Sequence, residues 1–303
     1  MKRTLFQRGV SWMASNRLLN FLLDEQYLKC LYWARMGKKL DLDDPQTFNQ
    51  KLQWLKIHDR KPEYTTLVDK YAVRQYISDV IGEQHLIPLV GGPWTNFNEI
   101  DFEALPNQFV LKCTHDSGGL VICRDKSKLD VLAAKKKISN SLKLNYYDYG
   151  REWQYKNVKP KIIAEQYMED CSKGQLIDYK FYCFNQEPKC FYASQGLENH
   201  ATAHISFYDL KGHKMPFKRL DYLDFEIDPD LPENYEQMLT IARRLANKVN
   251  SLFVRVDLYE INGKVYFSEI TFHPCSGFMP FDPIEWDYKF GNWLNLPKNK
   301  NET

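Results

Sequence analysis

The sequence lacks any apolar run approaching the roughly 18 residues that a membrane-spanning helix needs. It also lacks the apolar core of a secretion signal, because Asn16, Arg17 and Asn20 interrupt the apolar stretches near its beginning. No charge of one sign dominates, since 41 Lys and Arg stand against 39 Asp and Glu, which argues against a nucleic-acid partner. These absences favour a globular protein that works in the cytoplasm.

The seven cysteines form no Cys-x-x-Cys pair, so the spacing typical of zinc sites and redox pairs is missing. Several lie inside apolar runs, such as those around Cys113 and Cys183, and we expect buried free thiols in a reducing compartment. The Gly-x-x-x-x-Gly-Lys-Ser/Thr phosphate loop is missing as well. Any nucleotide must therefore be held by another arrangement.

A hydrophobic fraction of 44% over 303 residues is sufficient for a sizeable core. Apolar residues recur at helical spacing through most of the first hundred residues. We expect helices that end at Gly37 and Gly82, and another that begins with Asp44 as N-cap and Pro45 in its first turn. From Phe109 the pattern changes to short runs that predict strands.

The beginning of the chain combines apolar and basic side chains. The residues concerned are Leu18, Leu19, Phe21, Leu22 and Leu23, with Lys2, Arg3, Arg8 and Arg17. Such a segment could form a basic amphipathic helix that lies on an anionic membrane, here the inner membrane face. The alternative, which we favour, is a helix docked onto its own domain.

The stretch FVLKCTHDSGGLVIC, which begins at Phe109, places Lys112 near the end of a strand and a loop with Gly118 and Gly119 after it. Glycines allow backbone N–H groups to turn toward an anion, and a nearby lysine neutralises its charge. The stretch therefore predicts a phosphate site. A plain hairpin turn with a solvated lysine accounts for the same residues.

The stretch FVRVDLYEINGKVYFSEIT predicts a hairpin with carboxylates on both strands. A two-residue Asn-Gly turn by itself would pair Asp257 with Ser268 and point Glu269 to the opposite face. A three-residue connection or a bulge, with Gly263 in the left-handed conformation, would set Asp257 opposite Glu269. Two carboxylates that close need a cation between them, and oxygen ligands favour Mg²⁺. The alternative is two solvated charges on a surface hairpin.

The order of these pieces resembles the ATP-grasp superfamily: a lysine strand with a glycine loop, the strand IIAEQYM, an amphipathic helix and the hairpin above. More closely, the chain is similar to the TupA-like (teichuronopeptide-biosynthesis) branch from about Asp24 to Asp287. The stretches that carry this similarity are PQTFNQKLQWLK, LVDKYAVRQYI, LPNQFVLKCTHDSGG, KPKIIAEQYMED, DYKFYCFN and FVRVDLYEINGKVYFSEITFHPCSGF.

The resemblance implies an α+β fold in which two α+β subdomains clamp ATP, preceded by a mostly helical N-terminal region. The expected ranges are 1–100 for the helical region, 101–160 for the small subdomain with the phosphate-loop hairpin, and 161–303 for the large subdomain with the Mg²⁺-binding hairpin.

The resemblance also implies roles for individual residues. Lys70 and Lys112 would contact the ATP phosphates, under a lid formed by His115, Ser117, Gly118 and Gly119. The adenine hinge would be Glu165, Gln166, Tyr167 and Met168, and the ribose hydroxyls would lie at Asp178, close to Lys180. Mg²⁺ would be held by Asp257, Glu269 and Thr271, and the catalytic groups would be Arg255 and Lys112. Relatives usually carry Asn at the place of Thr271, whose hydroxyl is a weaker ligand.

The activity implied is ATP-dependent ligation of a carboxylate to an amine through an acyl phosphate. The branch implies a uronic acid of a cell-surface polysaccharide, or of its small-molecule or lipid-linked precursor, joined to an amino acid or peptide. A glycosyltransferase and an ATP-dependent sugar kinase of polysaccharide (capsule or O-antigen) biosynthesis stay open, as does a scaffold that binds ATP without catalysis.

Four further residues have chemistry that this activity does not need. His200 and His204 have the i, i+4 spacing of a zinc site, but the Glu of the zinc-protease pattern does not follow His200. His273 follows the proposed metal strand, where we favour a packed loop histidine over an acceptor contact. We interpret Cys275 beside it as structural, because the chemistry requires no acyl-enzyme.

Overall fold

The computed structural model describes residues 3–170, 176–197 and 199–297, and all structural statements refer to these. The helices are α1 (Leu5–Ser15), α2 (Asp24–Met36), α3 (Phe48–His58), α4 (Glu63–Val68), α5 (Val73–Ile81), α6 (Val131–Ser141), α7 (Tyr147–Gly150), α8 (Tyr235–Val249) and α9 (Glu285–Trp293). The strands are β1 (Leu89–Trp94), β2 (Phe109–Cys113), β3 (Leu120–Cys123), β4 (Ile162–Gln166), β5 (Ile177–Phe184), β6 (Glu187–Gln195), β7 (His204–Asp209), β8 (Lys218–Arg219), β9 (Phe253–Ile261), β10 (Lys264–Thr271) and β11 (Phe281–Asp282). This mixture of helices and antiparallel strands confirms the expected α+β class.

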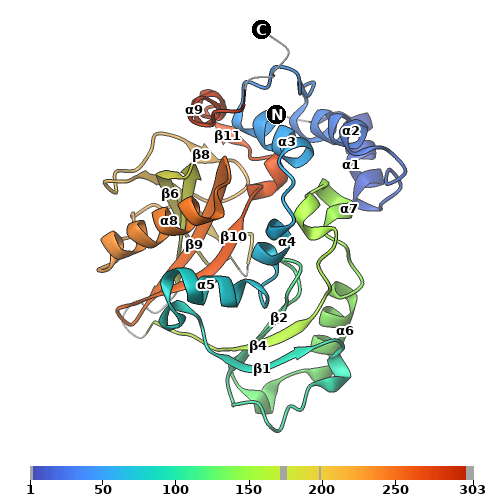
Figure 1. Cartoon of the computed structure of the whole chain (residues 1–303). Coiled ribbons are helices and arrows are strands. Elements are labelled where there is room, and N and C mark those ends of the chain that lie inside the picture. The colour runs from blue at the N-terminus through green and yellow to red at the C-terminus, as the bar shows by residue number, and fades with distance from the viewer. Residues whose placement is uncertain (1–2, 171–175, 198, 298–303) are drawn as a thin grey trace.

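The strands form two main sheets, which Figure 1 shows on either side of α4 and α5. The larger has the order β10-β9-β5-β6-β7 and the smaller β1-β4-β2-β3, while β8 pairs with β11. The small sheet takes β1 from before residue 101 and β4 from after residue 160. The domain ranges stay a prediction, and the sheet pairing extends beyond the expected 101–160.

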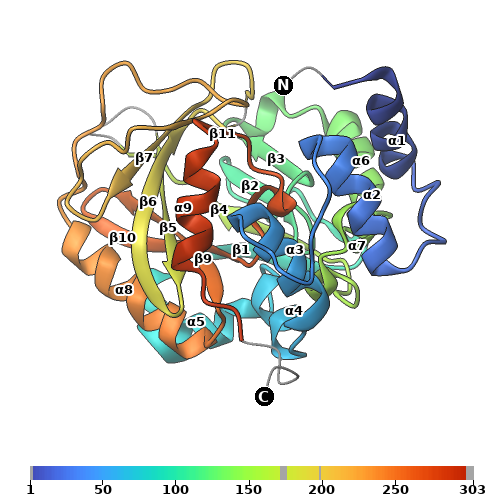
Figure 2. The same cartoon turned by 90° about the horizontal axis from the view of Figure 1, so that it is seen from above.

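The large sheet is covered on both faces. Because side chains alternate along a strand, Phe181 faces the core under α8 and α5, while Tyr182 faces a second core under α3 and α9. Figure 2 shows α5 and α8 side by side. The second core is rich in aromatic rings, with Phe48 packed edge-on against Phe253 and Phe290. Polar residues on this second face therefore lie beside a rigid aromatic support.

Smaller cores hold the rest of the molecule together. The small sheet packs on α6 through Leu111, Ala164 and Ile138, all fully buried. The first two helices pack around Tyr27 and Leu28. This N-terminal core is fastened to α7, since the Tyr27 hydroxyl lies within hydrogen-bond distance of the backbone carbonyls of Asp148 and Tyr149.

The glycines predicted the C-terminal ends of two helices correctly, whereas the predicted N-cap of another helix was wrong. Gly37 ends α2 with a φ of 68° and Gly82 ends α5 with a φ of 103°, as expected. The prediction of Asp44 as N-cap and Pro45 in the first turn was wrong. Thr47 is the N-cap of α3, because its hydroxyl and the side chain of Gln50 form a reciprocal capping box.

The first residues form a docked helix that is shorter than the segment predicted. Helix α1 ends at Ser15, and residues 16–22 form turns rather than a helix. Lys2 lies outside the described residues. In the described part of the chain no helix is long and apolar enough to cross a membrane. The six described cysteines are free thiols, and four of them are buried; Cys171 lies outside the described residues.

Candidate active site

A bulge in β10 brings the two acidic residues of the hairpin together. The turn is the two-residue form, with positive φ at Asn262 (50°) and Gly263 (72°), so the register begins with Ile261 opposite Lys264. The register then shifts between Phe267 and Glu269, which leaves Ser268 as the extra residue. Asp257 consequently lies opposite Glu269, the condition that a shared site requires. The shift comes from the middle of the strand and not from the turn.

The bulge also decides which face Glu269 occupies. Val265 and Phe267 point into the core beneath α8, and simple alternation would send Glu269 into the same core. After the bulge it is Ile270 that joins this core. Glu269 and Thr271 therefore emerge on the opposite face, where Asp257 lies. One inserted residue thus converts a buried, unpaired carboxylate into a site residue.

Arg255 binds all three predicted metal ligands. Its Nε donates to Asp257 Oδ1 at 2.6 Å, and its Nη2 donates to Asp257 Oδ2 at 2.6 Å. The same Nη2 lies 2.9 Å from Glu269 Oε1 and 3.0 Å from Thr271 Oγ1. This is a planar guanidinium fork held against a carboxylate. The three oxygen side chains therefore surround one position that already accepts positive charge.

A second cation joins this network from β5. Lys180 lies directly opposite Asp257 in the sheet, and its Nζ is 2.7 Å from Asp257 Oδ2 and 3.4 Å from Asp178 Oδ1. Burial lowers the pKa of Lys180, but the carboxylates of Asp178 and Asp257 outweigh it and hold the pKa well above the usual value. Lys180 therefore stays charged. Asp178 Oδ1 accepts no hydrogen bond in the described structure, although it is buried.

The charges around Glu269 keep it ionised. Burial raises the pKa of Glu269, but the positive charges of Arg255, Lys180 and Lys70 outweigh burial and bring the pKa down to about 2. Lys70 comes from the turn between α4 and α5, far from the hairpin in sequence. Its influence on Glu269 places it within electrostatic reach of the carboxylate pair.

Lys70 also fastens the glycine loop. Its backbone N–H donates to the Thr114 carbonyl, and its Nζ donates to the carbonyl of Asp116. The Asp116 carboxylate in turn accepts from the N–H of Gly119 and from the Ser141 hydroxyl. The loop after β2 is thus closed by its own aspartate, an arrangement that Asp and Gly favour in tight turns.

The predicted lid residues differ in exposure. Ser117 and Gly118 are exposed, and the Ser117 hydroxyl lies 2.9 Å from that of Tyr146. His115 is buried instead, with Nε2 on the Ser141 carbonyl and no hydrogen-bond partner for Nδ1 among the described residues. Gly119 is buried so tightly that an added Cβ would lie 2.5 Å from the Cys113 sulfur. The loop tip is therefore open, while its base is packed.

Lys112 and the predicted hinge meet on the small sheet. Lys112 Nζ lies 2.5 Å from Glu165 Oε2, and Arg74 approaches the other oxygen at 3.5 Å. No contact in the described structure joins Lys112 directly to Asp257 or Glu269. The backbone N–H of Gln166 donates to the Pro88 carbonyl.

The remaining hinge residues continue beyond β4. The Tyr167 hydroxyl accepts from Arg124, and Met168 is half-buried. The structure thus forms two groups, one around Asp257 on the large sheet and one around Lys112 on the small sheet. Lys70 is hydrogen-bonded to the glycine loop, and its charge acts on Glu269 of the first group.

The ligand chemistry of the Asp257 group fits a hard cation. Asp257, Glu269 and Thr271 offer carboxylate and hydroxyl oxygens, which Mg²⁺ prefers, and the position between them already holds a guanidinium. Within residues 3–170, 176–197 and 199–297, no group of three or more His, Cys, Asp or Glu forms a metal site of purely protein ligands. A cation here would need further oxygens from a bound ligand, as Mg²⁺ usually does with phosphates.

Several residues of the site were not predicted from the sequence. Asp116 lies in the quoted loop, and its Asp-x-x-Gly spacing could have indicated the turn that it closes. Arg74 and Tyr146 reach the site from other elements without a local signal. His273 packs inside a loop as we favoured, with Nδ1 3.1 Å from the Gln154 amide nitrogen.

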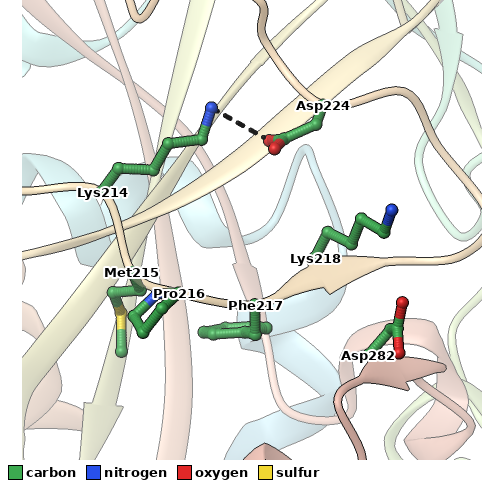
Figure 3. Close-up of a pocket in the computed structure, with 7 residues that line it drawn as sticks. All are labelled: Lys214, Met215, Pro216, Phe217, Lys218, Asp224 and Asp282. Atoms are coloured by element: carbon green, nitrogen blue, oxygen red, sulfur yellow. Dashed lines mark ion pairs between the residues drawn. The ribbon is translucent and has the colours of Figure 1, made fainter.

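A pocket elsewhere on the surface is separate from this site. It has a volume of about 380 Å³. Figure 3 shows the residues that line it, from the Lys214–Lys218 segment, Asp224 and Asp282 of β11. Lys214 points toward Asp224 across it, at 3.3 Å. None of the residues that line it belongs to the predicted nucleotide or metal site.

Comparisons with known proteins support the sequence resemblance. The sequence model of the family described as "TupA-like ATPgrasp" matches residues 50–295, which is most of the chain. A search of curated proteins returns no match.

The solved structures that are similar to this chain include three ligases. A D-alanine–D-alanine ligase from Helicobacter pylori shares 16% identity, with a TM-score of 0.46 over 82% of this chain and 69% of that one. A D-alanine–D-alanine ligase from Bacillus anthracis complexed with ATP shares 13%, with a TM-score of 0.44 over 95% and 91%. An L-amino acid ligase from Bacillus licheniformis shares 13%, with a TM-score of 0.41 over 85% and 55%.

Proposed function

This chain belongs to the TupA-like ATP-grasp family of carbon–nitrogen ligases, and on that premise we propose that it amidates a uronic acid with an amino acid or peptide. The uronic acid would belong to a cell-surface polysaccharide or to its small-molecule or lipid-linked precursor. The reaction would take place in the cytoplasm, and the free thiols of the described cysteines fit a reducing compartment.

One observation carries the proposal, namely the convergence of Asp257 and Glu269 at one register position around Arg255. Burying several charges together costs the fold free energy, and a surface hairpin without a ligand would have no use for such a cluster. The alternative of two solvated charges does not fit, because Asp257 is fully buried. A site that handles phosphates and a cation accounts for both the charges and their burial.

We propose that ATP lies between the two sheets. Lys112 and Lys70 would offset the charge of the phosphates, and the tip of the glycine loop, at Ser117 and Gly118, would cover them. Lys112 would exchange its partner Glu165 for a phosphate oxygen. The strand end from Glu165 to Met168 would meet the adenine.

The ribose hydroxyls would lie at Asp178. Its Oδ1 is buried and lies 3.4 Å from Lys180 Nζ, but it accepts no hydrogen bond in the described structure, so it could accept one from a ribose hydroxyl. Lys180 beside it forms an ion pair with Asp178 and would also hold Asp257 in place.

Mg²⁺ would be held by Asp257, Glu269 and, more weakly, Thr271, and it would supply charge stabilisation to the phosphates. Arg255 would then turn from these oxygens toward the reacting centre. There it would stabilise the negative charge that develops on the acyl oxygen. Loss of such a donor typically costs on the order of a hundredfold in rate.

The reaction proposed has two steps. A carboxylate oxygen of the uronic acid attacks the γ-phosphorus, the bond from that phosphorus to the bridging oxygen of ADP breaks, and an acyl phosphate forms. The amine then attacks the acyl carbon, the carbon–oxygen bond to phosphate breaks, and the amine nitrogen loses a proton. Phosphate leaves with the electron pair of that bond. Without phosphorylation the leaving group would be oxide, which is far too poor a leaving group, so the reaction requires ATP.

The test measures ADP and phosphate release by the purified protein with ATP and Mg²⁺. Glucuronic acid is the carboxylate donor and a panel of amino acids supplies the amine. We expect release only when both partners are present, an amide by mass spectrometry, and a hydroxamate when hydroxylamine replaces the amine. Asp257→Asn and Glu269→Gln should abolish all three signals.

Other outcomes would identify the alternatives. ADP release with a neutral sugar and no amine would mean a sugar kinase, and turnover of a nucleotide-sugar that survives Lys112→Ala would mean a glycosyltransferase. For the polysaccharide, cells with and without the gene are compared by mass spectrometry. An unchanged set of amino-acyl amides would contradict the proposed substrate while leaving the ligase chemistry intact.

A further inference from the structure

Helix α1 carries its largest apolar side chains on the face that points to solvent, not on the face that packs on its own domain. The two buried residues on its inner face are polar or small: Gln7, whose amide donates to the Trp33 carbonyl at 3.2 Å, and Ala14, which is 1% exposed. Its outer face carries Leu5 and Trp12, which are 83% and 62% exposed. A helix of a soluble domain normally shows the opposite distribution.

The exposed apolar surface continues beyond the helix. Phe6 is 73% exposed at the edge of the outer face, and its ring lies in an edge-to-face arrangement with Trp33. In the turns that follow, Leu18, Phe21 and Leu23 are also exposed. Both views place α1 and this turn segment at the outer edge of the molecule, beside α2 (Figure 1 and Figure 2). We call the six residues Leu5, Phe6, Trp12, Leu18, Phe21 and Leu23 the N-terminal apolar patch.

The charged residues within the segment 3–23 are all of one sign. Residues 3–23 contain Arg3, Arg8 and Arg17 and no acidic residue. Arg3 and Arg8 are exposed, and no ion pair engages either of them in the described structure. The guanidinium of Arg17 already has partners within the fold, because it donates to the Tyr149 hydroxyl and lies 3.9 Å from Asp148. Two free cations thus border six exposed apolar side chains.

We propose that the N-terminal apolar patch docks the protein onto an anionic phospholipid bilayer. Aromatic and leucine side chains that enter the acyl boundary, bordered by arginines at the headgroups, are what an interfacial helix requires. A protein partner would more often be met by a mixed polar rim with both signs of charge. The docking does not depend on the ligase proposal, because it rests on other residues.

The docked helix connects to the glycine loop through a short relay. Arg17 is bonded to Tyr149, the ring of Tyr149 lies 6.5 Å from that of Tyr146, and Tyr146 contacts Ser117 at the loop tip. Docking therefore orients this side of the molecule toward the bilayer surface. A saccharide acceptor carried on a lipid would then be presented on the side of the lid.

The experiment is co-sedimentation of the purified full chain with vesicles. Vesicles of phosphatidylcholine and phosphatidylglycerol (3:1) are compared with phosphatidylcholine alone, at low and high salt. We expect binding to the anionic vesicles only, weakened by salt. The triple variant Leu5→Ser, Trp12→Ser, Phe21→Ser should reduce partitioning on the order of a thousandfold, since each exposed apolar side chain contributes roughly tenfold.

Matched controls separate the N-terminal apolar patch from exposed apolar surface in general. The variant Leu132→Ser, Ile227→Ser removes side chains that are 79% and 87% exposed elsewhere and should leave binding unchanged. For charge, Arg3→Glu, Arg8→Glu should weaken binding at least roughly tenfold. Lys135→Glu and Lys136→Glu, on the exposed side of α6, should change it far less, and circular dichroism would show that every variant is folded.

Three results would overturn the proposal. The first is no binding to either kind of vesicle, and the second is equal binding to neutral and anionic vesicles. The third is a dimer in analytical ultracentrifugation that the triple variant converts to monomer, which would mean that a second copy covers the N-terminal apolar patch. None of these results bears on ATP-dependent ligation in solution, so the two proposals fail separately.

Discussion

Replacing Arg255 with Met tests how much the buried charge network holds the hairpin in place. Met keeps a long, unbranched side chain but removes the guanidinium and all its hydrogen bonds. Two of these bonds go to Asp257, at 2.6 Å each, and one each goes to Glu269 and Thr271. Hydrogen bonds to charged groups contribute about 1.5–3 kcal/mol each when both partners are buried.

The expected loss is smaller than the sum of these bonds. Lys180 remains 2.7 Å from Asp257, so that carboxylate keeps a cation, and the side chain of Glu269 is 35% exposed and regains water. Removing one partner from a buried ion pair costs about 3–5 kcal/mol, and we expect this range for Arg255→Met. It corresponds to a fall in melting temperature of roughly 6–20 °C.

The assay is thermal and urea unfolding without nucleotide. The control is Arg243→Met, because Arg243 also donates through Nε to a carboxylate, Glu187, at 3.0 Å. That pair is about half exposed on both sides, so its loss should cost less than about 1 kcal/mol.

The comparison of the two variants decides the result. If Arg255→Met lowered the melting temperature no more than Arg243→Met, the network would contribute nothing to the fold and the reasoning would be refuted. A large fall accompanied by unchanged ATP turnover would refute the proposed role of Arg255 at the reacting centre instead.

Two further predictions concern the pH dependence and the glycine loop. The pKa of Glu269 is lowered in the fold from about 4.5 to about 2, so its ionised form stabilises the fold above pH 4.5, and this stabilisation is lost as the pH falls toward 2. In urea unfolding, Glu269→Gln should therefore make the stability depend less on pH in this range. An unchanged pH dependence would contradict the assigned charge of Glu269. Gly119→Ala would place its Cβ 2.5 Å from the Cys113 sulfur and should destabilise the protein by about 1–3 kcal/mol. Gly118→Ala, whose Cβ would have no neighbour closer than 3.9 Å, should change thermal stability by less than about 0.5 kcal/mol, and equal effects would show that the base of the loop is not packed.

Local signals in the sequence were sufficient for much of the fold. The glycines at 37 and 82 end their helices because a residue without Cβ adopts positive φ without strain. The alternation along β9 correctly places Val254 and Val256 in the core and Arg255 and Asp257 on the other face. These features depend on neighbours within a few residues, and so the sequence predicts them directly.

Caps and helix limits at the beginning of the chain were less predictable. Thr47 was preferred to Asp44 as N-cap because Gln50 lies three residues further and completes the capping box. The apolar run from Leu18 to Leu23 was expected to be helical, but it is not. Leu19 and Leu22 pack against the core of α2 in a turn, and tertiary packing here overrides helical periodicity.

The sequence by itself determined the family, the α+β class and the candidate residues for binding phosphate and metal. Only the tertiary structure decided that Asp257 and Glu269 meet. The reason is the bulge at Ser268, which has no strong local signal and is favoured because it keeps Ile270 in the core. It also decided that Lys70 reaches this site, since a lysine some 200 residues away in sequence is brought there only by packing of α4 and α5 against the large sheet.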